Sequence, residues 1–276
     1  MNRTSVCLFF AALWLMVPWP GFGQGGLMVT PQRVTFDGKS RVQTVTVINR
    51  SQARQSFRLF FSEKRMTEAG LLADIEDPAE GFYASPLIRF SPRRVTLAPG
   101  QSQKVKLLVH KTAHLEPGEY RSHLVFQVIP EAAGLTLEAA NGESGGIGVK
   151  LTPLFGTSIP IIVRHGDLSA QVEIVQTELD RVADQPQVNL SLVFKRTGNR
   201  SVYGDVLIEH VSQDGQVTEM SQVKGMAIYT DIQQRTLDMA LMSPAADTFQ
   251  NGHLRITYTA RDSQTILAIF DLALNP

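Results

Sequence analysis

Cysteine is almost absent from this 276-residue sequence, which contains only Cys7. Because Cys7 lies in an apolar run at the start, the chain beyond that run can form no disulfide, and its fold must depend on burial of an apolar core. An excess of one charge is also absent, since 26 lysines and arginines balance 26 aspartates and glutamates. Without a strongly basic face, nucleic acid is not expected to be a main partner.

Motifs that mark catalytic or metal sites are missing as well. The sequence has no nucleophile elbow, no phosphate-binding glycine loop and no calcium loop. His110 and His114 lie four residues apart, but they follow an expected strand and do not indicate a helical zinc pair. We therefore expect no catalytic residue, no metal and no cofactor. A secreted β-rich hydrolase is an alternative, because catalytic triads assemble in space and leave no fixed spacing.

Residues 1–23 are predicted to be a secretory signal peptide. Residues 6–17 are apolar, follow a short polar start that includes Arg3, and end at prolines and glycines. This run is too short for a comfortable membrane span, and we expect cleavage between residues 23 and 24. An uncleaved anchor is the alternative. Because no second long apolar run follows, we expect no membrane insertion of the mature chain.

Short apolar runs separated by turn signals make up the rest of the chain, and helical periodicity is hard to find. This rhythm predicts an all-β fold of two β-sandwiches. A hinge-like break at residues 165–167 suggests domains over 24–164 and 165–276. Residues 62–86, with many charges and glycines, are expected to form a long loop. Residues 131–145, rich in alanine, glycine and glutamate, are expected to form a flexible connection.

Residues 147–164 are the most informative segment of the chain. Apolar side chains fill nearly every odd position, while the even positions are mostly small or polar. Since a strand presents alternate side chains to opposite faces, one face is apolar. At about 3.3 Å per residue the strand would span roughly 55 Å, which is about three times a typical strand. Either it bends into another domain or part of it is offered to a partner; a core strand followed by a linker is the alternative.

Two prolines lie within this segment, Pro153 and Pro160. A proline donates no hydrogen bond to a β-ladder, so each is expected at an edge, a bulge or a bend.

Three stretches of the chain, in order, resemble the periplasmic pilus-assembly chaperones of the PapD-like family. The first covers residues 31–38 and 45–49, the second covers 90–105, and the third covers 118–126 with the long strand that ends at Arg164. The resemblance extends from residue 27 to about residue 164 and more loosely beyond. It implies two immunoglobulin-like domains set at an angle, with a cleft between them, and a location in the periplasm.

The function that this resemblance implies is that of a non-enzymatic chaperone. Such a chaperone binds pilus or fimbrial subunits and delivers them to an outer-membrane usher. It lends its own strand to the incomplete sandwich of a subunit, which is a form of β-strand addition. The donated side chains would be Ile147, Val149, Leu151, Pro153 and Phe155. The main alternative is an exported immunoglobulin-like structural or adhesive surface protein, which would keep this strand paired internally.

The resemblance also implies specific charged residues. The family holds the subunit's C-terminal carboxylate with two basic residues, and Arg33 matches the first; its planar fork suits a carboxylate. The second, a lysine, falls at Pro160, so either another basic residue replaces it or the anchor differs; Lys150 lies much earlier and is not assigned. Glu119 and Arg164 match a pair that spans the domains and is expected to set their angle more than to stabilise them. In the family a third residue, an aspartate of the second domain, joins these two, and it has no evident match in this sequence.

Overall fold

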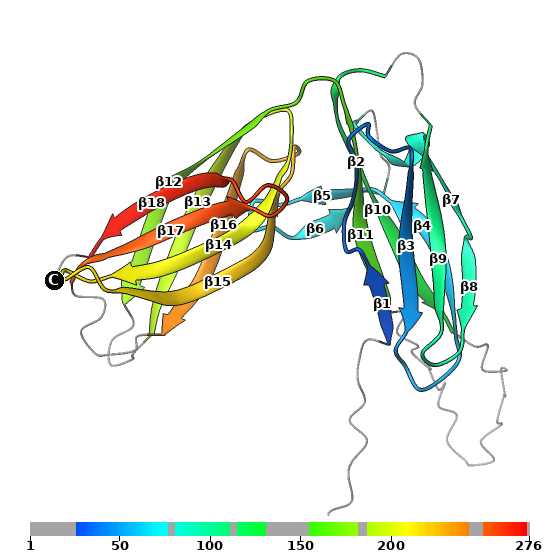
Figure 1. Cartoon of the computed structure of the whole chain (residues 1–276), viewed down its shortest axis with the longest axis horizontal. Helices are drawn as coiled ribbons and strands as arrows, with labels where there is room; N and C mark the ends of the chain where they lie inside the picture. Colours follow the sequence, from blue (N-terminus) through cyan, green and yellow to red (C-terminus); the bar gives the residue numbers. More distant parts are fainter. Residues whose placement is uncertain are drawn as a thin grey trace, which may run out of the picture.

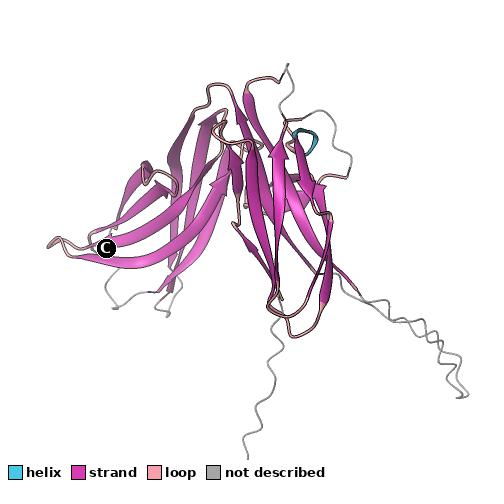
Figure 2. Ribbon diagram, turned by 45° about the vertical axis from the view of Figure 1, so that its right-hand side comes forward, coloured by secondary structure: helices cyan, strands magenta, loops and turns pink. Residues whose placement is uncertain are grey.

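The computed structural model confirms the all-β fold, with two β-sandwiches that meet at an angle (Figure 1). The structure describes residues 26–76, 81–110, 115–130, 155–181, 187–242 and 251–274. Among these residues the only helical element is a 3-10 turn, η1 (Ser85–Leu87) (Figure 2). No helix in the described part of the chain is long and apolar enough to cross a membrane.

The N-terminal sandwich consists of two sheets and a hairpin. The strand order of its first sheet is β1 (Leu27–Thr30), β3 (Val42–Asn49), β9 (Ser102–Val109) and β7 (Ile88–Ser91). The order of its second sheet is β2 (Val34–Phe36), β11 (Gly156–His165), β10 (Gly118–Ile129), β4 (Gln55–Ser62) and β8 (Arg94–Leu97). The hairpin pairs β5 (Lys64–Met66) with β6 (Leu72–Asp74).

The core of this sandwich forms because apolar residues occupy alternate positions on the facing strands. The fully buried side chains include Val45, Leu107, Phe57, Leu124 and Phe126. Each large apolar side chain buried in this way contributes about 1.5–3 kcal/mol of transfer free energy.

The C-terminal sandwich also has two sheets. The first has the order β12 (Ala170–Arg181), β13 (Gln187–Gly198) and β16 (Gln234–Met242). The second has the order β15 (Val217–Ile228), β14 (Val202–Val211), β17 (His253–Ala260) and β18 (Ile266–Ala273). Phe194 and Tyr258 meet edge to face in its core with ring centroids 5.6 Å apart. The Tyr258 hydroxyl donates a hydrogen bond to the Met226 carbonyl at 2.8 Å, so this buried polar group is satisfied.

The expectation of a long loop over residues 62–86 is wrong. Within the described part of this stretch the chain forms β5 and β6, and η1 begins at its end. Each strand is three residues long and carries exposed or charged residues, so neither shows an apolar alternation. The hairpin is held instead by contact with the other sandwich: the Thr236 amide donates to the Glu68 carbonyl at 2.8 Å, and the Met66 amide donates to Asp231 Oδ2 at 2.6 Å.

A small apolar cluster joins the two sandwiches. Met66 and Ile162 come from the N-terminal sandwich, and Ala227 and Tyr229 come from the C-terminal sandwich. This cluster explains why Ile162 is buried although it occupies an even position in the strand: the C-terminal sandwich covers the face that would otherwise be exposed.

β11 follows the predicted alternation in the part that the structure describes. Ile159, Ile161 and Val163 are buried in the core of the N-terminal sandwich. Phe155, immediately before β11, is 62% exposed. The other predicted donor residues lie outside the described residues; they are Ile147, Val149, Leu151 and Pro153. Lys150 and the predicted signal peptide also lie outside the described residues.

Candidate binding cleft between the sandwiches

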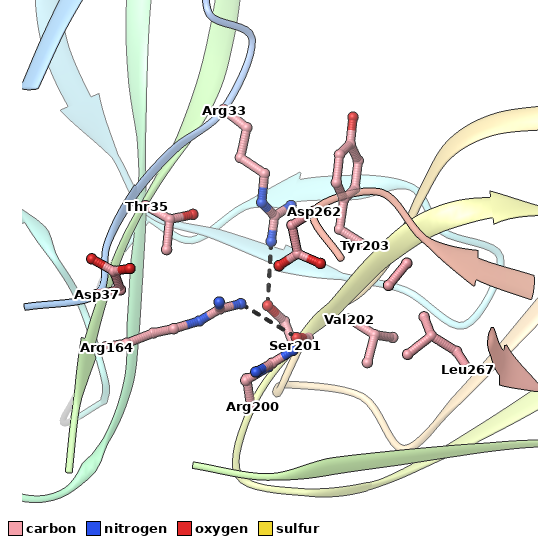
Figure 3. A pocket seen from close by; sticks show the side chains of 11 residues that line it. Arg33, Thr35, Asp37, Arg164, Arg200, Ser201, Val202, Tyr203, Asp262 and Leu267 are labelled. Carbon is pink, nitrogen blue, oxygen red and sulfur yellow. Dashed lines mark hydrogen bonds between the residues drawn. The ribbon is translucent and has the colours of Figure 1, made fainter. Parts of the chain in front are cut away.

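A cleft with a volume of about 250 Å³ lies where the two sandwiches meet. Three arginines line it: Arg33, immediately before β2, Arg164 of β11 and Arg200, which lies between β13 and β14. Figure 3 shows their side chains directed toward the space around Ser201. The other lining residues are Thr35, Asp37, Val202, Tyr203, Ala260, Asp262 and Leu267. This concentration of guanidinium groups makes the cleft suitable for an anion.

Arg33 reaches from the N-terminal sandwich onto the C-terminal sandwich. Its Nη1 donates to the Tyr229 hydroxyl at 3.4 Å and its Nη2 donates to Ser201 Oγ at 3.3 Å. Its Cζ also lies 4.6 Å from the ring centroid of Tyr203 and 5.4 Å from that of Tyr229, within the range of cation–π attraction. None of the ion pairs within the described residues includes Arg33. Its partners are neutral and distant, so the guanidinium retains its capacity for a carboxylate.

Glu119 and Arg164, which the family resemblance assigns to a pair that spans the domains, are in contact, but both lie in the N-terminal sandwich. They are opposite residues of β10 and β11, and Arg164 Nε donates to Glu119 Oε2 at 3.0 Å. Only 3% of Glu119 is exposed. The Ser201 amide of the C-terminal sandwich donates to the same carboxylate oxygen at 3.2 Å. This pair therefore also contacts the C-terminal sandwich, through a backbone amide of Ser201.

Replacing Glu119 with glutamine is expected to lower the free energy of unfolding by about 2–3 kcal/mol. The change leaves Arg164 without its charged partner in a half-buried site, and breaking a buried pair costs far more than the intact pair contributes. Chemical denaturation measures the effect. The control is Asp271→Asn, which breaks the exposed pair with Arg255 and is expected to cost less than about 1 kcal/mol. Equal effects of the two substitutions would contradict this account of Glu119.

An ion pair that joins the two sandwiches directly was not anticipated from the sequence. Arg121 Nη2 binds Asp231 Oδ2 at 2.9 Å, and Asp231 lies in the turn between β15 and β16. The Cζ of Arg121 is 3.8 Å from the ring centroid of Tyr229. Tyr229 therefore contacts two guanidinium groups, those of Arg121 and Arg33. No spacing in the sequence connects these residues, because they come from opposite sandwiches and meet only in the folded chain.

His123 is a buried histidine beside the cleft. It lies on β10, opposite Pro160 of β11 and Ser62 of β4, and only 1% of it is exposed. Neither ring nitrogen has a hydrogen-bond partner among the described residues. Burial, together with the positive charges of Arg121 and nearby basic residues, lowers the pKa of His123 from 6.5 to about 3. The imidazole beside the expected lysine position is therefore neutral at neutral pH and provides no second cation.

Pro160 is placed as the ladder argument predicts. It occupies β11 one residue before the pairing with β2 begins at Ile161, on a stretch whose outer side has no strand among the residues described. Lys64 is a lysine whose charge acts on His123, the residue opposite Pro160. Its Nζ already binds Asp74 Oδ1 at 2.6 Å.

No protein-family model matches the chain, and a search of curated proteins finds no match in sequence. Several solved structures are similar in fold. The YadV chaperone is 12% identical, with 90% of this chain and 100% of that chain covered and a TM-score of 0.46. The CsuC–CsuE chaperone–tip adhesion subunit complex of Acinetobacter baumannii is 10% identical over 89% and 97%, with a TM-score of 0.46. The chaperone–tip adhesin complex of CFA/I fimbriae is 11% identical over 89% and 98%, with a TM-score of 0.43. At this identity the likeness concerns the arrangement of strands and assigns no role to any residue.

Proposed function

We propose that this chain is a periplasmic, non-enzymatic chaperone that binds pilus or fimbrial subunits by strand addition along β11 and delivers them to an outer-membrane usher. The observation that carries the proposal is the uncovered outer edge of β11, which leads directly to Arg33. The contacts of the cleft, and the exposed Phe155 at the beginning of β11, support it further.

The edge of β11 is available over half of its length. β2 pairs with it only from Val34 opposite Ile161 to Phe36 opposite Val163. Residues 156–160 have no strand on that side among the residues that the structure describes. An uncovered edge presents unpaired amide and carbonyl groups and accepts a further strand. A strand added there would lie in line with β2 and enlarge the sheet.

Such a strand would have to end at Arg33, because β2 occupies the edge beyond it. If the strand runs parallel to β11, as β2 does, its carboxyl end arrives at the guanidinium. Arginine binds a carboxylate through two parallel hydrogen bonds and repels an amino terminus. Arg33 is therefore our candidate for the residue that holds the C-terminal carboxylate of the subunit.

The alternating apolar side chains of the donated strand are the other part of the proposal. The Phe155 carbonyl accepts a hydrogen bond from the Val128 amide at 3.0 Å, so the pairing with β10 continues past Gly156. By alternation Phe155 shares the face of Ile159, which is buried, yet it is itself mostly exposed. We propose that it fills a groove of the subunit together with the four residues that alternate before it: Ile147, Val149, Leu151 and Pro153.

The pair of Glu119 and Arg164 has a supporting role in the same proposal. Both residues bind Ser201 of the C-terminal sandwich, through its amide and, at 3.5 Å, its carbonyl. We propose that these contacts fix the angle between the sandwiches and thereby keep Arg33 at the end of the added strand.

The test is affinity purification of the tagged chain from the periplasm of a strain that carries the usher and subunit genes. The wild-type chain is expected to retain a small β-rich subunit and protect it from proteolysis. Leu151→Asp and Phe155→Asp are each expected to block capture, since a carboxylate cannot enter an apolar groove without a large desolvation cost.

The control is Leu108→Asp, a change of an exposed leucine on β9 in the opposite sheet, which is expected to leave capture intact. Protection of the subunit by both strand variants would refute strand donation. Transport of the chain itself to the cell surface, without a subunit, would favour the structural or adhesive alternative.

A further inference from the structure

Most cations around the cleft are already neutralised. Arg164 binds Glu119, Arg121 binds Asp231 and Lys64 binds Asp74, all at 3.0 Å or less. Arg33 and Arg200 enter none of the ion pairs found among the described residues. These two arginines, one from each sandwich, are the cations of the cleft that can take an external anion.

Arg200 is partly buried, yet no carboxylate among the described residues forms an ion pair with it. Its Nε is inaccessible to solvent and has no hydrogen-bond partner within the described part of the chain. A buried N–H donor without a partner costs free energy. In Figure 3 its side chain rises beside Ser201 toward the same space as Arg33.

The turn that carries Arg200 is held in place by a buried arginine. Arg196, which is 4% exposed, donates through Nη1 to the carbonyl of Gly198 at 2.8 Å and to that of Arg200 at 3.1 Å. Asn199 also holds this turn in place, because its Oδ1 accepts a hydrogen bond from the Ser169 amide at 2.9 Å. Because the backbone around Arg200 is fixed before a ligand arrives, little conformational entropy is lost when the ligand binds.

The charge balance of the cleft selects a single negative charge. The Arg164–Glu119 and Lys39–Asp37 pairs cancel. Arg33 and Arg200 then supply two positive charges against Asp262, so the net charge is +1, which matches a carboxylate better than a doubly charged phosphate. Val202 and Leu267 add an apolar wall, which suits the last side chain of a peptide.

We propose that Arg200 is the second basic residue of the anchor, and that Arg33 and Arg200 together bind the terminal carboxylate of an extended peptide. The inference rests on the proposed function and extends it, because it makes the anchor a joint product of the two sandwiches. The family's second basic residue would lie on β11, where this chain has Pro160. In this chain Arg200 of the C-terminal sandwich, on the other side of the cleft, would take its place.

The test uses the whole mature chain and two labelled ten-residue peptides of alternating valine and threonine. One peptide ends in a free carboxylate and the other ends in an amide. Fluorescence anisotropy measures the dissociation constants. The wild-type chain is expected to bind the free acid roughly ten- to a hundredfold more tightly than the amide, the range for a hydrogen bond to a charged group. Arg200→Ala and Arg33→Ala are each expected to lose most of this preference, and Arg200→Lys is expected to retain part of it.

Two internal controls keep the result interpretable. Affinity for the amide peptide should be the same in the wild type and in Arg200→Ala, which shows that the variant is folded, and Arg89→Ala, at an exposed position of β7, should behave as the wild type. Equal binding of acid and amide by the wild type, or a full preference for the acid in Arg200→Ala, overturns the inference. A lost preference in Arg200→Ala without any captured subunit in the periplasmic purification leaves this anchor standing and refutes the chaperone function.

Discussion

Replacement of Arg33 with alanine is expected to abolish capture of a pilus subunit while both sandwiches stay folded. The substitution removes the guanidinium at the end of the uncovered edge of β11, and it thereby leaves the carboxylate of the bound subunit buried without a partner. Loss of one member of such a pair costs about 3–5 kcal/mol, which weakens binding by more than a hundredfold. The measurement is the yield of complex from the periplasm, with subunit and chain quantified on the same gel.

Arg33 also contacts Tyr229 and Ser201, so a structural role must be separated from anchoring. Thermal unfolding of the free Arg33→Ala chain is expected to change little, because these hydrogen bonds, at 3.4 and 3.3 Å, are long and made to neutral groups. Arg33→Lys keeps the charge but not the fork and should recover only part of the capture. Wild-type amounts of complex with Arg33→Ala would refute the anchor.

The second large effect is a loss of stability in mild acid that originates at His123. Its pKa is about 3 in the folded chain and 6.5 when unfolded. Between these values the unfolded chain binds more protons, so the free energy of unfolding is full above pH 6.5 and falls as the pH decreases toward 3. At 1.36 kcal/mol per pH unit, the loss from pH 7 to pH 4.5 amounts to about 2–3 kcal/mol. Urea unfolding at a series of pH values measures this slope.

Two substitutions at this position test the assignment. His123→Leu and His123→Asn cannot titrate, and both are expected to flatten the slope between pH 4.5 and 6.5 whatever their effect on stability at pH 7. Asp74, whose pKa is lowered chiefly by its hydrogen bond with Lys64, loses its contribution only at lower pH, below its ordinary value of 3.8. An unchanged slope in both variants would show that the acid sensitivity arises elsewhere.

Local patterns were sufficient to predict the fold class. Alternation along residues 147–164 predicted that Ile159, Ile161 and Val163 share a face, and they are buried together. The same pattern could not predict burial of Ile162, because period-two reasoning treats the other face of the strand as exposed and the C-terminal sandwich covers it. The hairpin of β5 and β6 was missed for a related reason: its stability comes from contacts with the other sandwich, not from its own apolar pattern.

The cleft was only partly predictable. Arg33, Glu119 and Arg164 follow from the family resemblance, and the structure brings all three to Ser201. Arg200 and the Arg121–Asp231 pair follow from nothing in the sequence. A contact between two sandwiches joins positions far apart in the chain, and a single sequence carries no signal for such pairs.

The pairing of β2 with β11 has a consequence for the order in which the chain can fold. β2 stands near the beginning of the first sandwich and β11 is its last strand, so the parallel pairing closes a loop that includes nearly the whole sandwich. Closing so long a loop is entropically costly and slow. In a polypeptide that crosses a membrane amino end first, residues 34–36 would emerge early and wait for residues 161–163. Until then β2 has no sheet to join, so in a chain interrupted during export Arg33 would be held only on its β1 side, and the proposed anchor would be incomplete even if the other strands had already paired.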